Sequence, residues 1–143
     1  MSIKDVAAIR TLIERQFASL SWKLGKQGDW ASFSGDFFPD AALYPSARPA
    51  KRQSVEDFVR RMASLAQDKL KTFQERGLGS NVQVFGNVAI AAAACEIIEN
   101  ESTSIRGVEM LLLVKDGGRW RIVAQAWDTE SEERRIPPAL LES

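Results

Sequence analysis

The sequence predicts an α+β fold in which three N-terminal helices pack on a mostly antiparallel sheet. Apolar residues recur at helical spacing in the first half of the 143-residue chain and at strand spacing from Leu70 onward. Two tight-turn sequences, Gly86-Asn87 and Gly117-Gly118, divide the second half into neighbouring strands. With 45% hydrophobic residues and no internal linker, residues 1–143 are expected to form a single domain, with about residues 132–143 as a C-terminal tail.

The first helix is predicted to begin near Val6 and to end near Gly25. Its apolar side chains recur every three or four positions and therefore share one face: Val6, Ile9, Ile13, Phe17, Leu20 and Leu24. A second, short helix is expected after Asp29, which is a suitable N-cap, and it should be stopped by Gly35 or Pro39.

A very short strand at Leu43 and Tyr44 is expected before the third helix. The sequence SVED at 54–57 matches a capping box in which Asp57 takes the place of the usual glutamate. Apolar residues at helical spacing then predict a helix that ends before about Lys69.

Four strands are expected in the second half of the chain. Residues 71–86 are expected to form a strand with a bulge at Gly77 or Gly79, and residues 88–99 form its neighbour. Residues 107–116 and 118–129 are expected to form a hairpin around Gly117-Gly118.

A regular hairpin at this turn assigns each side chain to a face, because directly opposed residues lie on the same side of the sheet. Leu113 should oppose Ile122, and Glu109 should oppose Ala126. One face then consists of Glu109, Leu111, Leu113, Trp120, Ile122, Ala124, Ala126 and Asp128. The other face consists of Val108, Met110, Leu112, Val114, Val123, Gln125 and Trp127.

Both faces are apolar, and one layer of three helices can cover only one of them. A large exposed apolar patch usually marks an interaction site. We therefore expect a homodimer through Val108, Met110, Leu112, Val123 and Trp127. A sheet that curls on itself, or that is covered by the tail sequence IPPALLE, is the alternative.

Composition excludes several classes of partner and site. Nineteen basic and nineteen acidic side chains give no net charge to attract nucleic acid or an anionic membrane. The N-terminus lacks a signal-peptide pattern, so a cytoplasmic protein is expected. The chain has no histidine, no phosphate-binding loop and no Cys/His set, and we predict neither a cofactor nor a metal site. Cys95 is interpreted as a core thiol, and the basic residues Arg48, Lys51 and Arg52 as a solvated loop.

Two stretches, GDWASFSGDFFPDAALYP at 28–45 and GGRWRIVAQAWDTE at 117–130, resemble the nuclear transport factor 2-like superfamily. Within it the chain is most similar to uncharacterised bacterial proteins near ketosteroid isomerases and SnoaL-like cyclases. The resemblance implies a curved sheet that forms a cone with an internal pocket, and an outer face that often makes dimers. It also implies that the face carrying Trp120 looks inward, with Glu109, Ala124, Ala126 and Asp128.

The chain departs from the catalytic residues of that superfamily. The aspartate base of ketosteroid isomerases falls near Tyr44 or Pro45, and their helix-one tyrosine falls near Ser21 or Trp22. Many relatives carry a histidine on the last strand, where this chain has alanine. The family's known isomerase and cyclase chemistry is therefore not implied.

Glu109 and Asp128 are the candidate catalytic residues. A carboxyl group in an apolar cavity has a raised pKa and can act as an acid or base near neutral pH, and two such groups titrate as a pair. The alternative is that each lies hydrated near a strand end. Candidate ligand-binding residues are Trp22, Tyr44, Trp30, Ala124 and Ala126, of which Trp22 and Tyr44 could also donate hydrogen bonds to Glu109.

Two interpretations are compatible with these residues. The chain is either a domain that binds a small hydrophobic ligand, with or without modest isomerase, cyclase or dehydratase-like acid/base activity, or a non-catalytic homodimerisation module in which the cavity is incidental. Burial of Glu109 in a cavity would favour the first interpretation, and a solvent-exposed Glu109 would favour the second.

Overall fold

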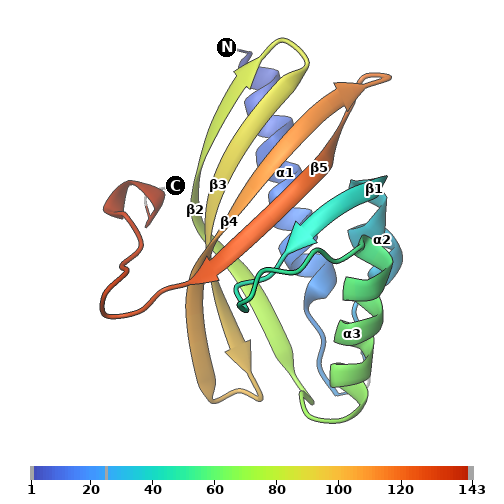
Figure 1. Ribbon diagram of the computed structural model, residues 1–143, viewed down its shortest axis with the longest axis vertical. Helices are drawn as coiled ribbons and strands as arrows, with labels where there is room; N and C mark the ends of the chain where they lie inside the picture. The colour runs from blue at the N-terminus through green and yellow to red at the C-terminus, as the bar shows by residue number, and fades with distance from the viewer. Residues whose placement is uncertain (1, 25, 142–143) are drawn as a thin grey trace.

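The computed structural model describes residues 2–24 and 26–141, and they form an α+β fold with one five-stranded sheet (Figure 1). The helices are α1 (Ile3–Leu20), α2 (Trp30–Gly35), α3 (Val55–Gln67) and the 3-10 helix η1 (Pro138–Leu141). The strands are β1 (Phe37–Tyr44), β2 (Phe73–Phe85), β3 (Val88–Glu99), β4 (Thr103–Asp116) and β5 (Arg119–Thr129). The strand order is β1-β5-β4-β3-β2, in which only β1 and β5 pair in parallel. The predicted fold class and the mostly antiparallel sheet are confirmed.

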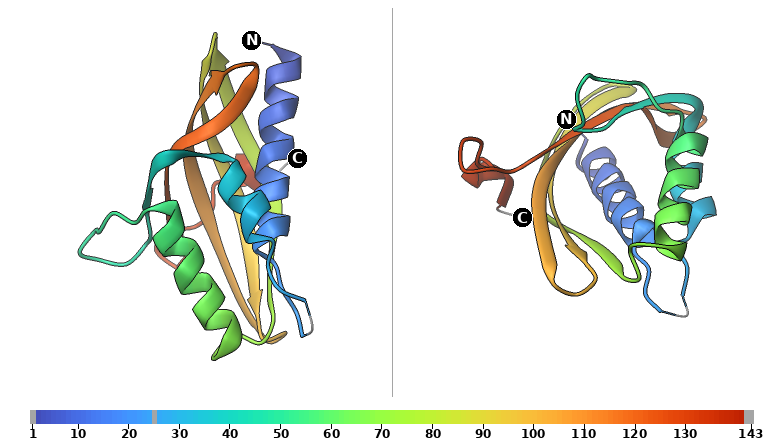
Figure 2. Two further views of the ribbon diagram at one scale, coloured as in Figure 1. Left: turned by 90° about the vertical axis from the view of Figure 1, so that its right-hand side faces the viewer. Right: turned by 60° about the horizontal axis from the view of Figure 1, so that its bottom comes forward.

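The sheet is strongly curved, and its two faces are covered differently. Helices α1 and α3 lie on the concave side, whereas the C-terminal segment lies on the convex side (Figure 2). We call these sides the inner face and the outer face. The main core lies between the inner face and the helices, where Ile9 and Leu12 of α1 are buried with Leu113 and Ile122 of the sheet.

Helix α1 is shorter than the sequence suggested. It begins after Ser2, whose hydroxyl oxygen accepts a hydrogen bond from the Asp5 amide at 3.2 Å. It ends at Leu20 because the chain becomes extended at Ser21 and the backbone of Trp22 pairs with Phe73, at the start of β2. The expected continuation to about Gly25 was wrong, since this strand-like pairing replaces the last helical turn.

Strand β1 is longer than expected and begins directly after the second helix. Asp36, 1% exposed, lies at this junction and receives two hydrogen bonds from Arg15 of α1, Nε to Oδ2 at 3.0 Å and Nη2 to Oδ1 at 2.7 Å. The strand tolerates Pro39 because its pairing with β5 is irregular between Phe37 and Ala42. Helix α3 agrees with its prediction, with Ser54 as the N-cap.

Glycines stand where the sequence predicted the turns and the bulge. The β2–β3 turn contains Gly86 at φ 58°, and the β4–β5 turn contains Gly117 and Gly118 at φ 60° and 75°. Both β4–β5 turn residues are in the left-handed region, as a type I′ hairpin turn requires. The β2–β3 pairing shifts between Gly77 and Gly79, which confirms the bulge.

The predicted register of the β4–β5 hairpin is correct only up to Ile122. Leu113 pairs with Ile122, but Leu112 pairs with Ala124, so Val123 is an extra residue and forms a bulge. Beyond it every side chain of β5 changes face, because side chains alternate along a strand. Glu109 therefore opposes Trp127 instead of Ala126.

Because of this bulge, some residues predicted on the inner face lie on the outer face, and some predicted on the outer face lie on the inner face. Ala124, Ala126 and Asp128 are not on the inner face but on the outer face, beside Met110 and Leu112. Gln125 and Trp127 were expected outside and instead point inward; Gln125 is 4% exposed, and Trp127 packs against the main core.

The C-terminal segment covers part of the outer face, which realises one of the alternatives left open by the sequence. Ile136 and Leu140 pack against Ala94, with Leu78 and Val108 alongside. The rest of the face is uncovered, and Ile90, Met110 and Leu112 are 53%, 56% and 45% exposed. None of the helices within the described residues is long and apolar enough to cross a membrane.

Candidate ligand site in the inner cavity

A cavity of about 230 Å³ lies between the inner face of the sheet and helix α3. Residues 45–47, in the loop after β1, line one side of it. Its apolar wall consists of Leu20, Phe58, Met62, Leu65, Leu70, Phe73, Ile97, Ile105 and Trp127. Glu75, Cys95 and Glu109 are set into this wall from the sheet. The cavity is smaller than the 300–1,000 Å³ typical of sites for drug-sized molecules.

Strand pairing brings these three polar side chains together. Cys95 of β3 pairs with Gly77 of β2 on one side and with Gly107 of β4 on the other. Glu75 and Glu109 are therefore its diagonal neighbours on the same face of the sheet. Because each residue directly opposite Cys95 is a glycine, no side chain separates either carboxyl group from the thiol.

Both carboxyl groups are buried, and both are incompletely hydrogen-bonded. Glu75 and Glu109 are each 7% exposed. Glu75 lies beside the Cys95 thiol and Glu109 beside the Gln125 side chain, and each neighbour lowers the pKa of its carboxyl group. Glu75 Oε1 and Glu109 Oε2 are buried without any hydrogen-bond partner. Buried polar atoms without a partner are rare in folded proteins, and each calls for an explanation such as a catalytic role or a bound water or ion.

A pair of glutamines on the side of α1 holds Glu109 in place. The Gln16 side chain donates from Nε2 to Gln125 Oε1 at 2.9 Å, and Gln125 donates from Nε2 to Gln16 Oε1 at 3.3 Å. Gln16 is 1% exposed and Gln125 is 4% exposed. The network therefore runs from the first helix through β5 to the carboxyl group in the cavity.

Burial shifts the protonation of the site toward its neutral forms. Burial raises the pKa of Glu75 to about 7, although the hydrogen bond from Cys95 opposes this shift. Burial and then the charge of Glu75 raise the pKa of Glu109 well above its usual value, and the hydrogen bond from Gln125 opposes this. Burial and the two nearby carboxylates also raise the pKa of the Cys95 thiol. Near neutral pH, Glu75 and Glu109 therefore behave as a coupled pair that keeps at least one proton.

Of the two predicted acids, only Glu109 lies in this buried cluster. Asp128 is exposed on the outer face, where its carboxylate forms an ion pair with Arg134 at 3.3 Å. Its contribution to the cavity wall is therefore made by the strand itself and not by a side chain on the inner face. Glu109 is buried and not hydrated near a strand end, the alternative that the sequence had left open.

The predicted aromatic residues lie apart from the cavity. The Trp22 ring stacks on Phe73 at 4.7 Å, and its Nε1 donates to the Leu70 carbonyl oxygen at 2.9 Å, so it is not a donor to Glu109. Trp30 contacts the edge of Trp22 and lines a separate surface groove with it. Tyr44 is 39% exposed and belongs to the outer face.

Glu75 is the residue that sequence reasoning missed. It lies in the charged run QER at 74–76, in a stretch that was predicted as a strand without an assignment of its faces. A usable signal was present, since Phe73, Glu75 and Gly77 alternate with polar residues. Placing the buried Phe73 on the inner face would have placed Glu75 there as well.

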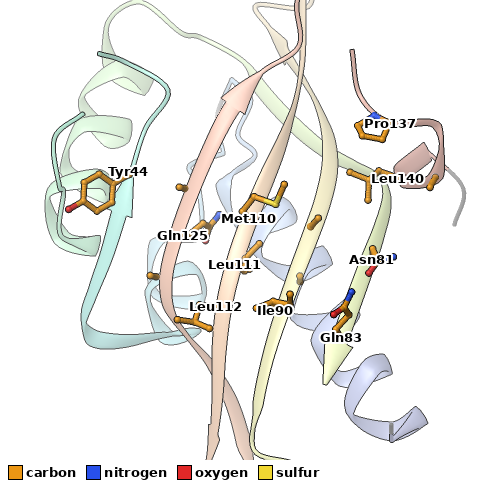
Figure 3. Close-up of a pocket in the computed structure, with 15 residues that line it drawn as sticks. Tyr44, Asn81, Gln83, Ile90, Met110, Leu111, Leu112, Gln125, Pro137 and Leu140 are labelled. Carbon is orange, nitrogen blue, oxygen red and sulfur yellow. The ribbon is translucent and has the colours of Figure 1, made fainter. Parts of the chain in front are cut away.

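A second, larger hollow lies on the outer face, between the sheet and the C-terminal segment (Figure 3). Its volume is about 680 Å³. Ile90, Met110 and Leu112 project into it from the strands, and Pro137 and Leu140 border it from the C-terminal segment. Ala124 and Ala126 also line it, so these two predicted ligand-binding residues belong to this hollow and not to the inner cavity.

Comparison with known protein families gives one family model, described as "Putative lumazine-binding", which matches residues 4–128. The chain belongs to this family. The match includes Glu75, Cys95, Glu109 and Gln125, so the whole acid cluster lies within the family's domain. No curated protein matches the chain.

Solved structures place this family member in the nuclear transport factor 2-like fold, as the sequence predicted. An NTF2-like protein of unknown function from Silicibacter pomeroyi DSS-3 is 20% identical with a TM-score of 0.65, covering 91% of this chain and 100% of its own. The "Putative Scytalone Dehydratase" from Novosphingobium aromaticivorans DSM 12444 has 10% identity and a TM-score of 0.73, with 90% and 86% covered. A "putative dehydratase" of the NTF2-like family from Streptomyces avermitilis has 12% identity and a TM-score of 0.72, with 90% and 97% covered. At these identities the likeness concerns the fold alone.

Proposed function

We propose that this protein is a small-molecule-binding domain whose site is the inner cavity and whose polar contacts are Glu75 and Glu109. The observation that carries the proposal is the pair of unpartnered carboxyl oxygens, Glu75 Oε1 and Glu109 Oε2, in side chains buried at the wall of the cavity. Leaving such atoms unsatisfied costs about 1–3 kcal/mol each. A ligand that donates hydrogen bonds to these two oxygens recovers that free energy.

Acid/base chemistry is the activity that this pair supports. Near neutral pH one carboxyl group is ready to accept a proton, while the other still holds one. That combination is what an isomerase, a cyclase or a dehydratase requires when one carbon loses a proton and an oxygen gains one. The dehydratase names of two similar structures are consistent with this class, and the family description supports a compact ring as the ligand.

Nuclear magnetic resonance of the backbone amides tests the location of the site. We would titrate the ¹⁵N-labelled protein with lumazine and, separately, with benzylamine as compact ring compounds. Binding in the inner cavity should shift the amide signals of residues near Glu75, Cys95 and Glu109. Shifts confined to Ile90, Met110 and Leu112 would instead locate binding at the outer hollow, and no shifts with either compound at millimolar concentration would contradict the proposal.

A homodimerisation module is the second candidate, favoured by the exposed apolar residues Ile90, Met110 and Leu112. We propose a dimer through this part of the outer face. Of the five residues expected there from the sequence, Trp127 points inward and Val108 packs beneath the C-terminal segment, so Met110 and Leu112 become the centre of the contact. Sedimentation equilibrium checks it: a dimer is expected at micromolar concentration, and Met110→Asp should produce monomers. A wild-type monomer at that concentration would exclude this candidate.

A further inference from the structure

We propose that the inner cavity selects a small organic cation, such as a protonated primary amine, over a neutral compound of the same shape. The inference rests on the cavity being the ligand site, as proposed above, and adds the charge of the ligand. Four features of the cavity support it: the unpartnered oxygens, the missing counter-charge, the composition of the acid cluster and the aromatic walls.

Two carboxyl oxygens at the inner wall of the cavity are unpartnered, one on each side of Cys95; the other unpartnered atom of a lining residue, Arg106 Nε, belongs to a side chain that alternates with Gly107 and so lies on the other face of β4. Glu75 Oε1 and Glu109 Oε2 both accept hydrogen bonds when their groups are ionised. An ammonium group has three N–H donors and no acceptor, so either oxygen can accept a hydrogen bond from it. A neutral alcohol has a single O–H donor and brings no positive charge to the acids. Hydrogen bonds between ionised partners are also about twice as strong as neutral ones.

The cavity holds two acids without a basic partner. None of the ion pairs formed among residues 2–24 and 26–141 includes Glu75 or Glu109. The other charged residues along the cavity wall belong to α3, β3, β4 and β5, and they are Arg61, Glu99, Arg106 and Asp128.

Neither arginine serves as the counter-charge. Arg61 is exposed on α3, and Arg106 points from β4 toward Glu130, with its Nη1 3.8 Å from Glu130 Oε1. The titratable group that does contact the acid pair is the Cys95 thiol, which stays protonated. A cationic ligand would therefore supply a charge that the described part of the folded chain does not.

The ligand set favours an organic cation over a metal ion. In the part of the chain that the structure describes, no three cysteine, histidine, aspartate or glutamate side chains are arranged to hold a metal. Phe58 and Trp127, whose rings contact each other edge to face at 5.5 Å, form an aromatic wall of the same cavity. Aromatic ring faces attract ammonium groups, and this attraction grows where water is excluded.

Cation binding must be linked to proton release. A positive charge between Glu75 and Glu109 stabilises their ionised forms, so protons held by the pair are lost when the cation binds. The affinity should then rise about tenfold for each unit of pH for every proton released. A neutral ligand of the same shape leaves the pair protonated, and its affinity should change little with pH.

Isothermal titration calorimetry with benzylamine and benzyl alcohol tests the inference, because the two compounds differ mainly in charge. The wild-type protein is titrated between pH 5 and pH 8 in buffers of different ionisation enthalpy, which reveals the number of protons released. We expect benzylamine to bind at least about tenfold more tightly than benzyl alcohol at pH 8 and to lose about tenfold per pH unit toward pH 5. Proton release should accompany benzylamine only.

Variants that keep side-chain shape locate the effect. Glu75→Gln combined with Glu109→Gln should abolish both the preference for benzylamine and the proton release, whereas Asp128→Asn, at an exposed acid on the outer face of β5, should leave both unchanged. Equal wild-type affinity for the two compounds would overturn charge selection while leaving the cavity as the ligand site. Binding of neither compound would overturn both proposals, and a preference that survives in the double variant would overturn the role of the acid pair.

Discussion

Glu75 and Glu109 face one cavity from two strands, β2 and β4, that do not pair with each other, and each has a carboxyl oxygen without a hydrogen-bond partner. Strand β3 separates them, and at this point it presents a thiol instead of a charge or a bulky side chain. Such an arrangement is costly for stability because two acids share a dry environment without a base. Proteins commonly accept this kind of cost where the group has a task in binding or catalysis.

Stability should fall as the pH rises from about 4.5 to 7. The folded-state pKa of Glu75 is raised from 4.5 to about 7, so in this interval the folded chain holds more protons than the unfolded chain. The contribution of Glu75 to the free energy of unfolding is greatest below pH 4.5. It falls by up to about 1.4 kcal/mol per pH unit as the pH rises toward 7. Glu75→Gln should flatten this slope, measured as the melting temperature against pH.

The control for this prediction is Asp128→Asn, which removes an exposed carboxylate on β5 and should keep the wild-type slope. A slope of about 1 kcal/mol per pH unit corresponds to roughly 3 °C in melting temperature for a domain of this size. Identical pH profiles for the wild type and for Glu75→Gln would show that the buried acid titrates normally.

Gln125→Leu should destabilise the fold by about 1–3 kcal/mol, since it leaves both the Gln16 amide and Glu109 without their buried partner. The double variant Gln16→Leu with Gln125→Leu should be less destabilised than the sum of the two single variants, because it removes both ends of one interaction. Urea denaturation of the four proteins gives this coupling energy. Strict additivity would mean that the two glutamines do not support each other.

Cysteine labelling should report the true register of β5. Ala126→Cys should react rapidly with a maleimide, because position 126 is exposed on the outer face, while Gln125→Cys should stay protected in the cavity network. The native Cys95 should be silent in folded protein, since it is buried and its thiol pKa is raised. Labelling is measured by mass spectrometry. A faster reaction at position 125 than at position 126 would support the regular register predicted from the sequence.

Arg15→Ala should cost about 1.5–3 kcal/mol, the range for hydrogen bonds to a charged group. Its guanidinium makes two hydrogen bonds to Asp36, which is 1% exposed and would keep only the more distant Arg119, 3.8 Å away. Arg119→Ala is the matched control and should cost clearly less. Chemical denaturation ranks the two variants, and equal losses would mean that Arg15 contributes only as surface charge.

Sequence patterns predicted the fold well because each element carries its own local signal. The Gly117-Gly118 turn fixes where β4 and β5 meet, and Gly77 and Gly79 indicate the bulge in β2. Glu109 was correctly expected inside because it shares the parity of Leu111 and Leu113 on β4, a strand whose alternation is unbroken.

The candidate site was only half predictable, for two physical reasons. The bulge at Val123 contains no glycine and leaves no mark in a run of apolar residues, so Asp128 was assigned to the wrong face. The alternation of Phe73, Glu75 and Gly77 indicates the face of Glu75, but its position beside Cys95 and Glu109 depends on the pairing of β2 with β3 and of β3 with β4. Local periodicity does not show which strands pair or in which register.

The bulge at Val123 has a consequence for how this chain tolerates insertions and deletions. The alternation of side chains along β5 is interrupted at that residue. Every side chain beyond it therefore lies on the opposite side of the sheet from the one that a regular strand would give. Removing Val123 would abolish the bulge but leave Ala124 opposite Leu112, so Gln125 and Trp127 would still point inward and Asp128 outward. A one-residue deletion at Val123 should thus disturb the cavity less than a deletion of Ala126, which would move Trp127 to the outer face.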